Sequence, residues 1–424
     1  MKIDRGLLMT LAAATLTAAC ASAGATGGGA GGGGPRVSVA APDVTCSTGR
    51  LSGTPAADSA ASILALINTA ADSAQAAQYA QSRQVAGRAI AGDPTNAYGY
   101  YLAGQAALGT ADYADADSLL RRSKELCPEL GAYDVDRLLA GGAALAFDRA
   151  QTAIQAGDTT TAVAGYETAL RMDPTNYPAE FYLGLVAFGR QNTDESVRRW
   201  RRVATIIDAL PADSSAQVNA DRAGARANAI NALTFASRQY LEREQTAQAA
   251  QLLQELSRDL PNNADVAYYY ALALNTQQRW QELLPAAQRA VEMAPLNYGA
   301  LVLMYNGYAG QSQAAAAAGQ NAQASELGRQ AALVRQRHDS LPVQIEQLQV
   351  DVEDTNTAIR GVAVGTGRTA PVTVEFTLHG ASGPLGTGRT TITPPAEADA
   401  QSRFELTVDN TQAVTGVTYR VVGG

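Results

Sequence analysis

The sequence contains few of the residues that most enzymes and metalloproteins depend on. It has two histidines, three cysteines and two tryptophans among its 424 residues. Neither His338 nor His379 has a second metal ligand at helical spacing, so the count argues against zinc sites built from Cys and His. No Gly-Lys-Ser/Thr loop and no Gly-x-Ser-x-Gly motif occurs, so we expect no catalytic residue, no cofactor and no metal. A hydrolase whose site is assembled from distant residues stays open as a hypothesis.

Charged residues are also scarce. They make up 17% of the chain, the net charge is −8 and the isoelectric point is near 5.0. No run of Lys or Arg stands out, so we do not expect nucleic-acid binding. The hydrophobic share is 46%, much of it alanine, which has the highest helix propensity. The composition therefore favours a folded, helix-rich chain.

The first residues are typical of an export signal. Lys2 and Arg5 precede a short apolar stretch at 6–16, which ends in Leu-Thr-Ala-Ala-Cys. This ending resembles the bacterial lipobox, in which the cysteine, here Cys20, is lipidated and becomes the new N-terminus. Thr17 stands where the lipobox usually has a large aliphatic residue. The alternative is an ordinary signal peptide that is cleaved at an Ala-x-Ala site.

The next segment predicts a tether. Residues 20–50 are rich in glycine, and such sequences behave as flexible coils. Ala21 follows Cys20, and the absence of an aspartate there favours the outer membrane of a Gram-negative cell. We expect an exported lipoprotein that faces the periplasm or the cell surface. In that compartment Cys46 and Cys127 are a candidate disulfide; two separate thiols are the alternative.

Prolines recur along the chain at a fixed period. Pro94 and Pro128 are 34 residues apart, and so are Pro261 and Pro295. The sequence Asp-Pro-Thr-Asn occurs at 93–96 and again at 173–176. A period of 34 is the length of the tetratricopeptide repeat, in which each repeat is one helix–turn–helix.

Small residues fall where helices of such repeats must touch. In the repeat that starts at Ala97, Gly104 is position 8, Ala116 is position 20 and Leu120 is position 24. Residues 63–340 therefore resemble the tetratricopeptide family, with six or seven hairpins and two insertions, at about 129–142 and 209–229. We expect an extended or an extra helix in the second insertion. The resemblance implies a right-handed helical solenoid whose concave face is lined by the first helix of each repeat.

The resemblance also implies which residues line that groove. Positions 5, 9 and 12 of the first helices are mostly aromatic or apolar, with a few amides, which suits an extended peptide or an amphipathic partner helix. The predicted partner-binding residues are Tyr101, Gln105, Leu108, Phe147, Gln151, Phe181, Leu185, Phe188, Arg238 and Tyr268. The alternative for each is packing between helices.

The pattern changes from helical to alternating after Pro342. Alternation such as Val-Thr-Val-Glu-Phe-Thr-Leu at 372–378 is typical of strands. Six such runs separated by Gly, Pro and Asn turns predict a small antiparallel β-sandwich, similar to immunoglobulin-like modules.

The sequence thus predicts a mainly helical protein with four parts. They are a signal peptide at 1–19, a lipid-anchor cysteine and tether at 20–50, helical repeats at 51–342 and a β-sandwich at 343–424. We expect a membrane-tethered scaffold of the cell envelope that binds partner proteins or peptides in the groove. The alternative is a surface lipoprotein that binds a glycan or another nutrient.

Overall fold

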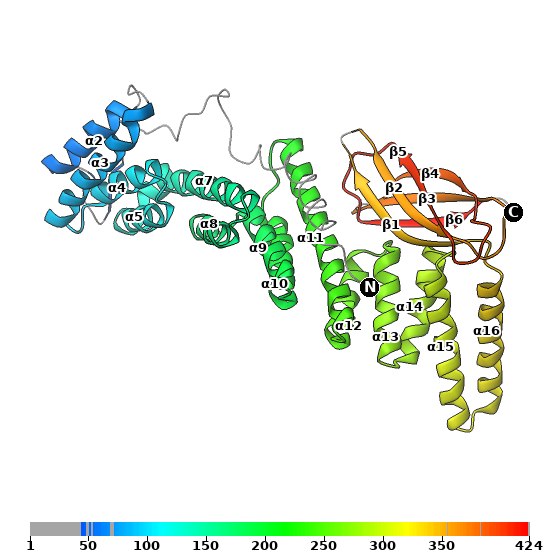
Figure 1. The fold of residues 1–424 in the computed structure, drawn as a ribbon. Coiled ribbons are helices and arrows are strands. Elements are labelled where there is room, and N and C mark those ends of the chain that lie inside the picture. Colours follow the sequence, from blue (N-terminus) through cyan, green and yellow to red (C-terminus); the bar gives the residue numbers. More distant parts are fainter. Residues whose placement is uncertain are drawn as a thin grey trace. The chain divides into compact units, whose positions relative to one another are not determined.

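The computed structural model describes residues 44–47, 51, 54–67, 72–353, 355–381 and 383–422 (Figure 1). The predicted signal peptide, the lipidation site Cys20 and most of the predicted tether lie outside these residues. The described chain forms two compact units, which we call the first unit, ending at Arg190, and the second unit, beginning at Gln191. Among the described residues, no helix combines the length and the apolar character that crossing a bilayer requires.

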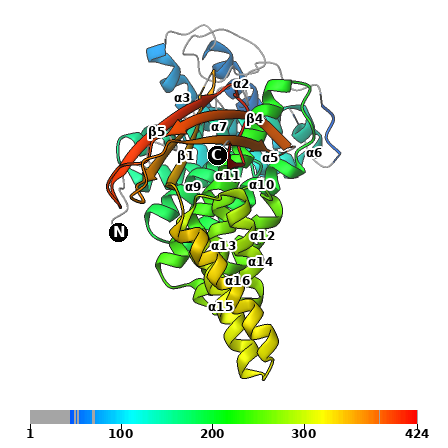
Figure 2. The same ribbon diagram turned by 90° about the vertical axis from the view of Figure 1, so that its right-hand side faces the viewer.

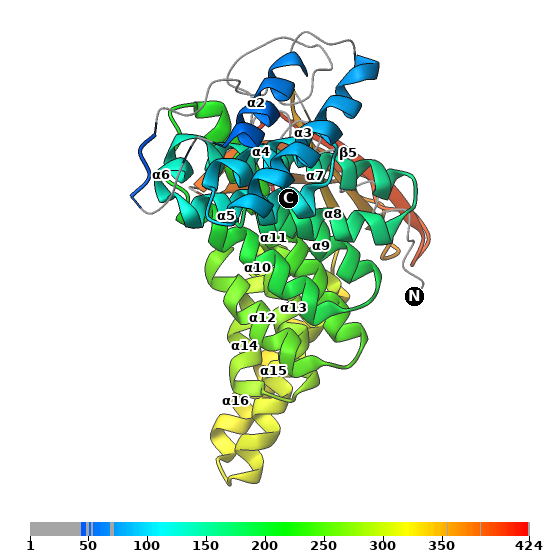
Figure 3. The same cartoon turned by 90° about the vertical axis from the view of Figure 1, so that its left-hand side faces the viewer.

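The first unit consists of helices that pack as hairpins, α2 with α3, α4 with α5 and α7 with α8. Figure 3 shows the neighbouring helices α2 to α5 of this unit in the foreground. The elements are α2 (Pro55–Ile67), α3 (Asp72–Gly92), α4 (Ala97–Gly109), α5 (Tyr113–Leu126), α6 (Pro128–Leu130), the π-helical turn η1 (Gly131–Val135), α7 (Asp136–Gln155), α8 (Thr159–Met172) and α9 (Tyr177–Gly189).

The second unit contains further helical hairpins and all the strands. Its helices are α10 (Thr193–Ala209), α11 (Ala216–Glu242), α12 (Thr246–Asp259), α13 (Ala264–Thr276), α14 (Trp280–Met293), α15 (Tyr298–Ala317) and α16 (Asn321–Asp339). Its strands are β1 (Gln344–Val352), β2 (Thr357–Val364), β3 (Val372–Gly380), β4 (Gly383–Ile392), β5 (Gln401–Val408) and β6 (Gly416–Val421).

The repeated Asp-Pro-Thr-Asn sequence has the same structural role at both places. The Asp93 carboxylate accepts hydrogen bonds from the Thr95 amide at 2.9 Å and the Thr95 hydroxyl at 2.7 Å. Asn96 then caps α4 by accepting from the Gly99 amide at 3.0 Å. Residues 173–176 repeat this arrangement, with Asn176 capping α9. The sequence therefore ends one hairpin and begins the next, because an Asx turn is followed by an N-cap.

Small residues allow the close helix contacts that the repeat pattern predicts. A Cβ placed on Gly104 would lie 2.6 Å from Cγ of Leu120, so α4 and α5 can approach only because position 8 is glycine. Gly310 of α15 has the same role, since a Cβ there would lie 2.4 Å from the indole of Trp280. The predicted tetratricopeptide-like hairpins are confirmed.

Both predicted insertions are largely helical. The first comprises α6, η1 and the beginning of α7, which makes this repeat's first helix unusually long. The second is absorbed into α11, whose 27 residues extend the following repeat at its N-terminal end. The alanine-rich segment that begins at Ala314 is helical to Ala317, because alanine favours the helix.

The strands form two three-stranded antiparallel sheets, with the orders β1-β2-β5 and β4-β3-β6. The sheets pack through apolar side chains; the rings of Phe376 on β3 and Phe404 on β5 have centroids 5.8 Å apart. The six predicted strands are all present, and β3 extends the predicted run at 372–378 to Gly380. The polar face of β3 carries Glu375, which accepts hydrogen bonds from Arg389 and Arg420.

The strands and the last helices share one hydrophobic core. Val334 of α16, Leu296 before α15 and Phe376 of β3 belong to the same buried cluster. The Ile345 amide donates to the Leu296 carbonyl at 3.1 Å, and the Asn263 amide nitrogen donates to the Thr415 carbonyl at 2.9 Å. Figure 2 shows the strands over one end of α13 to α16. The strands therefore belong to the same compact unit as these helices, whereas the sequence analysis treated them as a separate module.

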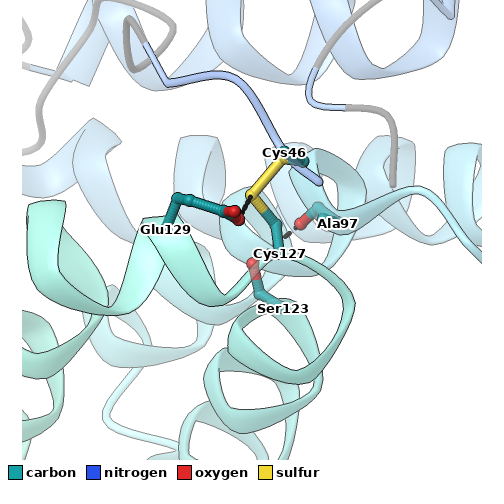
Figure 4. The surroundings of a disulfide bond; sticks show 5 residues. All are labelled: Cys46, Ala97, Ser123, Cys127 and Glu129. Carbon is teal, nitrogen blue, oxygen red and sulfur yellow. Dashed lines mark hydrogen bonds between the residues drawn. A yellow bond between two sulfur atoms is a disulfide. The ribbon is translucent and has the colours of Figure 1, made fainter. Parts of the chain in front are cut away.

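The predicted disulfide is present in the first unit. Cys46 and Cys127 are bonded, with Cα atoms 5.1 Å apart. Figure 4 shows the Glu129 carboxylate beside the Cys127 sulfur, at 3.6 Å, and the Ser123 hydroxyl donating to the Ala97 carbonyl. The bridge attaches the segment before α2 to the end of α5.

Candidate partner-binding surface

Most of the predicted groove residues of the first unit are buried. Six of the ten predicted residues have exposures of 9% or less, and all six belong to this unit: Tyr101, Gln105, Leu108, Phe147, Phe181 and Phe188. A side chain this buried is covered by other atoms of the protein and does not contact a ligand in this arrangement. For these six residues the packing alternative holds, and the expectation that they line an open groove is corrected.

The first insertion explains the burial of Tyr101. The Tyr101 hydroxyl donates to the Asp134 carboxylate at 2.5 Å, and Asp134 lies in the π-helical turn η1. Arg137 donates to the same carboxylate at 2.7 Å. The inserted residues therefore occupy the position beside Tyr101 that a regular repeat would leave to solvent. The sequence located the insertion but gave no sign of where it would fold.

An aromatic cluster explains the burial of Phe147. Its ring lies 5.6 Å from that of Tyr166 and 5.7 Å from that of Tyr182, measured between centroids. Tyr182 also contacts Phe181, at 6.1 Å. These rings join α7, α8 and α9. Their contribution is to the stability of the first unit, since edge-to-face and stacked rings add to the effect of burial.

Both glutamines among the predicted residues keep buried amide atoms without a hydrogen-bond partner among the described residues. Neither the amide nitrogen nor the amide oxygen of Gln105 has a hydrogen-bond partner there, and the same holds for the amide nitrogen of Gln151. Gln151 and Leu185 are half-buried. This unit offers a weaker candidate surface than the second one, because six of its eight predicted residues are buried.

The second unit brings the remaining two predicted residues together. Arg238 comes from α11 and Tyr268 from α13, and both are half-buried. The guanidinium carbon of Arg238 lies 5.1 Å from the ring centroid of Tyr269 and 6.0 Å from that of Phe235. The rings of Tyr268 and Tyr269 meet edge to face with centroids 5.2 Å apart. We call these residues, with Asp265 and Glu346 described next, the α11–α13 surface.

Two carboxylates belong to this surface. Asp265 lies in the first turn of α13, and Glu346 lies on β1. Both are exposed, and both lie close enough to the Tyr268 hydroxyl to raise its pKa, after the larger effect of burial; Arg238 acts in the opposite sense. Charged residues of α11, α13 and β1 thus influence the pKa of Tyr268.

Burial acts on two further groups of this surface. Burial raises the pKa of Asp265, although Arg238 nearby lowers it. Burial also raises the pKa of Tyr269 to about 12, against the effect of Arg238. Both phenols therefore stay neutral at physiological pH.

Several contacts hold the surface in shape. The Tyr268 hydroxyl packs on α15, where a Cβ on Gly299 would lie 2.8 Å from it. Asn263 caps α13 by accepting from the Val266 amide and at the same time donates to the Thr415 carbonyl. These contacts position Tyr268 and Asp265 against the strands without a ligand, so the surface is preformed.

The arrangement provides groups that can bind a polar or charged part of a partner. It combines an arginine stacked on aromatic rings, two carboxylates and the polar edges of two phenols. Among the described residues no ion pair joins Arg238, Asp265 or Glu346 to any other group within 4.0 Å. No group of three His, Cys, Asp or Glu residues suited to a metal occurs in the described part of the chain. His338 instead packs against Tyr298, with centroids 4.1 Å apart, and His379 shares a hydrogen bond with Thr418.

Only part of this surface was predicted from the sequence. Arg238 and Tyr268 were predicted from their repeat positions, whereas Phe235, Asp265 and Glu346 were not. The repeat register could have suggested Phe235 and Asp265, since both lie on first helices of hairpins. Nothing in the sequence indicates Glu346, because its approach to Tyr268 depends on how the strands pack on α13.

A small cavity of the second unit lies elsewhere. It has a volume of about 260 Å³ and is lined by Glu292, Met293, Thr377, Thr418, Tyr419 and Arg420. No predicted site residue contributes to it. Its polar lining atoms come from α14 and from the strands β3 and β6.

Comparisons with known proteins give the following matches. No family model and no curated protein matches the chain. Among solved structures, MamA from Desulfovibrio magneticus RS-1 is 15% identical with a TM-score of 0.28, covering 47% of this chain and 97% of its own. YrrB, described as a TPR protein with an unusual peptide-binding site, is 14% identical with a TM-score of 0.28, covering 49% of this chain and 92% of its own.

A TPR repeat-containing protein of Cytophaga hutchinsonii, in its C-terminal part, is 11% identical with a TM-score of 0.27; the match covers 65% of this chain and 95% of its own. The similar structures thus include tetratricopeptide repeat proteins. The assignment of the repeats in this chain rests on the hairpins, caps and small-residue contacts described above.

Proposed function

We propose that the protein is an interaction scaffold that binds a segment of a partner protein on the α11–α13 surface. One observation carries this proposal. Arg238 is held on the faces of Tyr269 and Phe235 and forms no ion pair among the described residues. An arginine stacked on aromatic rings and free to bind is a frequent hot spot of protein interfaces. The helical hairpins supply a rigid frame, which lowers the entropy lost on binding.

The partner would lie in the cell envelope. The resemblance of residues 1–20 to a lipoprotein signal supports export and lipidation at Cys20, and the glycine-rich segment supports a tether. A disulfide between Cys46 and Cys127 suits an exported protein, since structural disulfides persist in oxidising compartments. We propose an outer-membrane lipoprotein that faces the periplasm or the surface, where the anchor raises the local concentration of the partner.

The tryptophans do not favour the glycan-binding alternative. Trp200 is 1% exposed, and Trp280 packs against Gly310. The Trp200 ring is therefore closed to a sugar, and the half-buried Trp280 ring has α15 packed against it. No other described feature singles out a glycan.

The binding proposal is tested by crosslinking the protein in its native membranes. The parent is compared with Arg238→Ala, with Tyr268→Ala and with a control, Leu333→Ala, whose side chain is 58% exposed on α16. We expect a discrete set of envelope proteins to be captured by the parent and the control and to be lost in the two surface variants. Equal capture by all four proteins would show that the α11–α13 surface does not bind the partner.

The location is tested separately. A Cys20→Ser variant should no longer incorporate labelled fatty acid and should leave the outer-membrane fraction for the soluble periplasmic fraction. Recovery of the parent without a lipid label, in the soluble fraction, would contradict the proposed anchor and leave the binding proposal intact.

A further inference from the structure

We propose that the cavity between α14 and the strands β3 and β6 binds a zwitterion of amino-acid size, with its ammonium group at Glu292 and its carboxylate group at Arg420. This cavity shares no residue with the α11–α13 surface, so the inference goes beyond the proposed function and does not depend on it. All the residues that line the cavity belong to the second unit, in which α14 packs against β6.

The size of the cavity suits one small ligand. Its volume of about 260 Å³ is the space of about nine molecules of liquid water, and a sphere of this volume is about 8 Å across. The ammonium nitrogen and the carboxylate oxygens of an amino acid are about 3 Å apart, and a hydrogen bond of about 3 Å at each end extends this span to about 9 Å. An amino acid can therefore reach both walls of the cavity at once.

The wall that the strands form is positively charged. Arg389 and Arg420 both donate to Glu375, so these three side chains together carry one net positive charge. Arg420 uses its Nε edge for Glu375, at 2.7 Å, while its side chain is 71% exposed. A guanidinium has five N–H groups in a fixed plane, so those that Glu375 does not use can donate to a carboxylate in the cavity. The contact with Glu375 also holds the Arg420 side chain in place before a ligand arrives.

Two threonines stand beside Arg420 on the same wall. Thr377 of β3 and Thr418 of β6 are paired in the register of the sheet, one step along from the pair of Glu375 and Arg420, so their side chains lie on one face. The Thr418 hydroxyl is 2.9 Å from Nε2 of His379, whose Nδ1 is buried without a partner among the described residues. A proton on Nδ1 would be an unpaired buried donor, so the neutral ring carries its proton on Nε2 and donates to Thr418. The Thr418 hydroxyl proton is therefore available to a carboxylate in the cavity.

The wall that α14 forms is negatively charged. Glu292 and Met293 are the last two residues of this helix, and Glu292 is exposed and forms no ion pair with another described residue. The free carbonyl groups of the last turn add the negative end of the helix dipole. A simple cation would leave Arg420 and the threonines without a partner, and a simple anion would be repelled by Glu292. A ligand that carries both charges matches both walls, and its short apolar part can rest on Met293.

The test is isothermal titration calorimetry of the full chain with each of the common free amino acids. We expect at least one of them to bind with a dissociation constant below about 10 mM. For that amino acid, the matching acid without the amino group and the matching amine without the carboxyl group should each bind about three- to tenfold more weakly, because each loses one charge pair. If no amino acid binds in this range, or if either truncated compound binds as tightly as the amino acid, the inference is wrong.

Two variants assign the two ends of the ligand. Glu292→Gln should weaken binding of the amino acid about three- to tenfold and leave the affinity for the acid without the amino group unchanged, because that compound lacks the ammonium. Arg420→Gln should do the same for the amino acid and for the amine without the carboxyl group; Arg389 still holds Glu375, and tryptophan fluorescence checks that the second unit is folded.

Matched controls are Glu397→Gln and Arg403→Gln, which remove exposed charges elsewhere on the β-sandwich and should change neither affinity. Binding of the amino acid that is insensitive to both Glu292→Gln and Arg420→Gln would place the ligand outside this cavity and overturn the inference. None of these outcomes affects the crosslinking test of the α11–α13 surface.

Discussion

The disulfide between Cys46 and Cys127 should contribute strongly to the stability of the first unit. The two cysteines are separated by 81 residues, so the bond closes a long loop. The loop-closure entropy of such a bond stabilises the folded state by about 4.5 kcal/mol near room temperature, within the range of about 2–5 kcal/mol found for native disulfides of small exported domains. Cys46→Ala removes the bond while changing a half-buried side chain, and so leaves the fully buried Cys127 in place.

The positions of the tryptophans allow the two units to be followed separately. Trp200 and Trp280 both lie beyond residue 190, so tryptophan fluorescence reports on the second unit alone. Circular dichroism reports on the helices of both. In urea, a slope of about 2 kcal/mol per molar gives a shift of about 2 M in the midpoint of the first unit. We expect Cys46→Ala to shift the circular-dichroism transition by this amount and to leave the fluorescence transition unchanged.

Two further results complete the experiment. Adding a reductant to the parent should reproduce the effect of Cys46→Ala, and adding it to the variant should have no further effect. If neither the variant nor the reduced parent loses stability in the circular-dichroism transition, the disulfide does not constrain the unfolded chain as reasoned here. A parallel shift of the fluorescence transition would show instead that the two units unfold together.

Three other predictions follow from the packing and the charges. Gly104→Ala should destabilise the first unit by about 1–3 kcal/mol, because the new Cβ meets α5. Gly141→Ala places its new Cβ where nothing lies within 4 Å, so it should stabilise α7 by about 0.5–1 kcal/mol. Urea unfolding measures both changes. Asn263→Ala removes the N-cap of α13 and its bond to the strands, so the fluorescence transition should lose about 1–3 kcal/mol, and an unchanged transition would contradict this. Hydrogen bonds from Arg389 and Arg420 hold the pKa of Glu375 below its usual value. The contribution of Glu375 to the free energy of unfolding is therefore present above the pKa of the unfolded chain and is lost as the pH falls through the lowered value. Glu375→Gln should reduce the acid sensitivity of unfolding, and an unaltered pH profile would argue against this reasoning.

The repeats could be predicted from the sequence because the caps and contacts that define them involve residues of one turn or one hairpin. A helix cap needs only the residues of one turn, so Asn96 and Asn176 could be located by their motif. A contact between the two helices of one hairpin involves residues at a fixed separation, so Gly104 could be matched to Leu120. The strands after Pro342 were likewise visible, since alternation of apolar and polar residues has a period of two.

The exposure of the groove residues was predicted less well, because burial depends on which other elements pack against a side chain. The repeat register put Tyr101 and Phe147 on the first helices, but their exposure depends on what packs against them. The π-helical turn carrying Asp134 lies beside Tyr101, and the rings of α8 and α9 cover Phe147. Asp134 lies in an insertion that a regular repeat does not contain, and Tyr182 belongs to the next hairpin, so neither contact follows from the pattern within a single repeat.

The sequence by itself determined the elements: hairpins of tetratricopeptide length, their caps, the close contacts at glycine, six strands and a pair of cysteines in bonding positions. The tertiary structure decided which surface is open. It placed the strands on α13 to α16 in one core and brought Glu346 and Asp265 to the same tyrosine, Tyr268. The physical reason is that secondary structure depends on residues close in the sequence. A binding surface depends instead on which charged and aromatic side chains stay accessible after the apolar faces of all the elements have packed together.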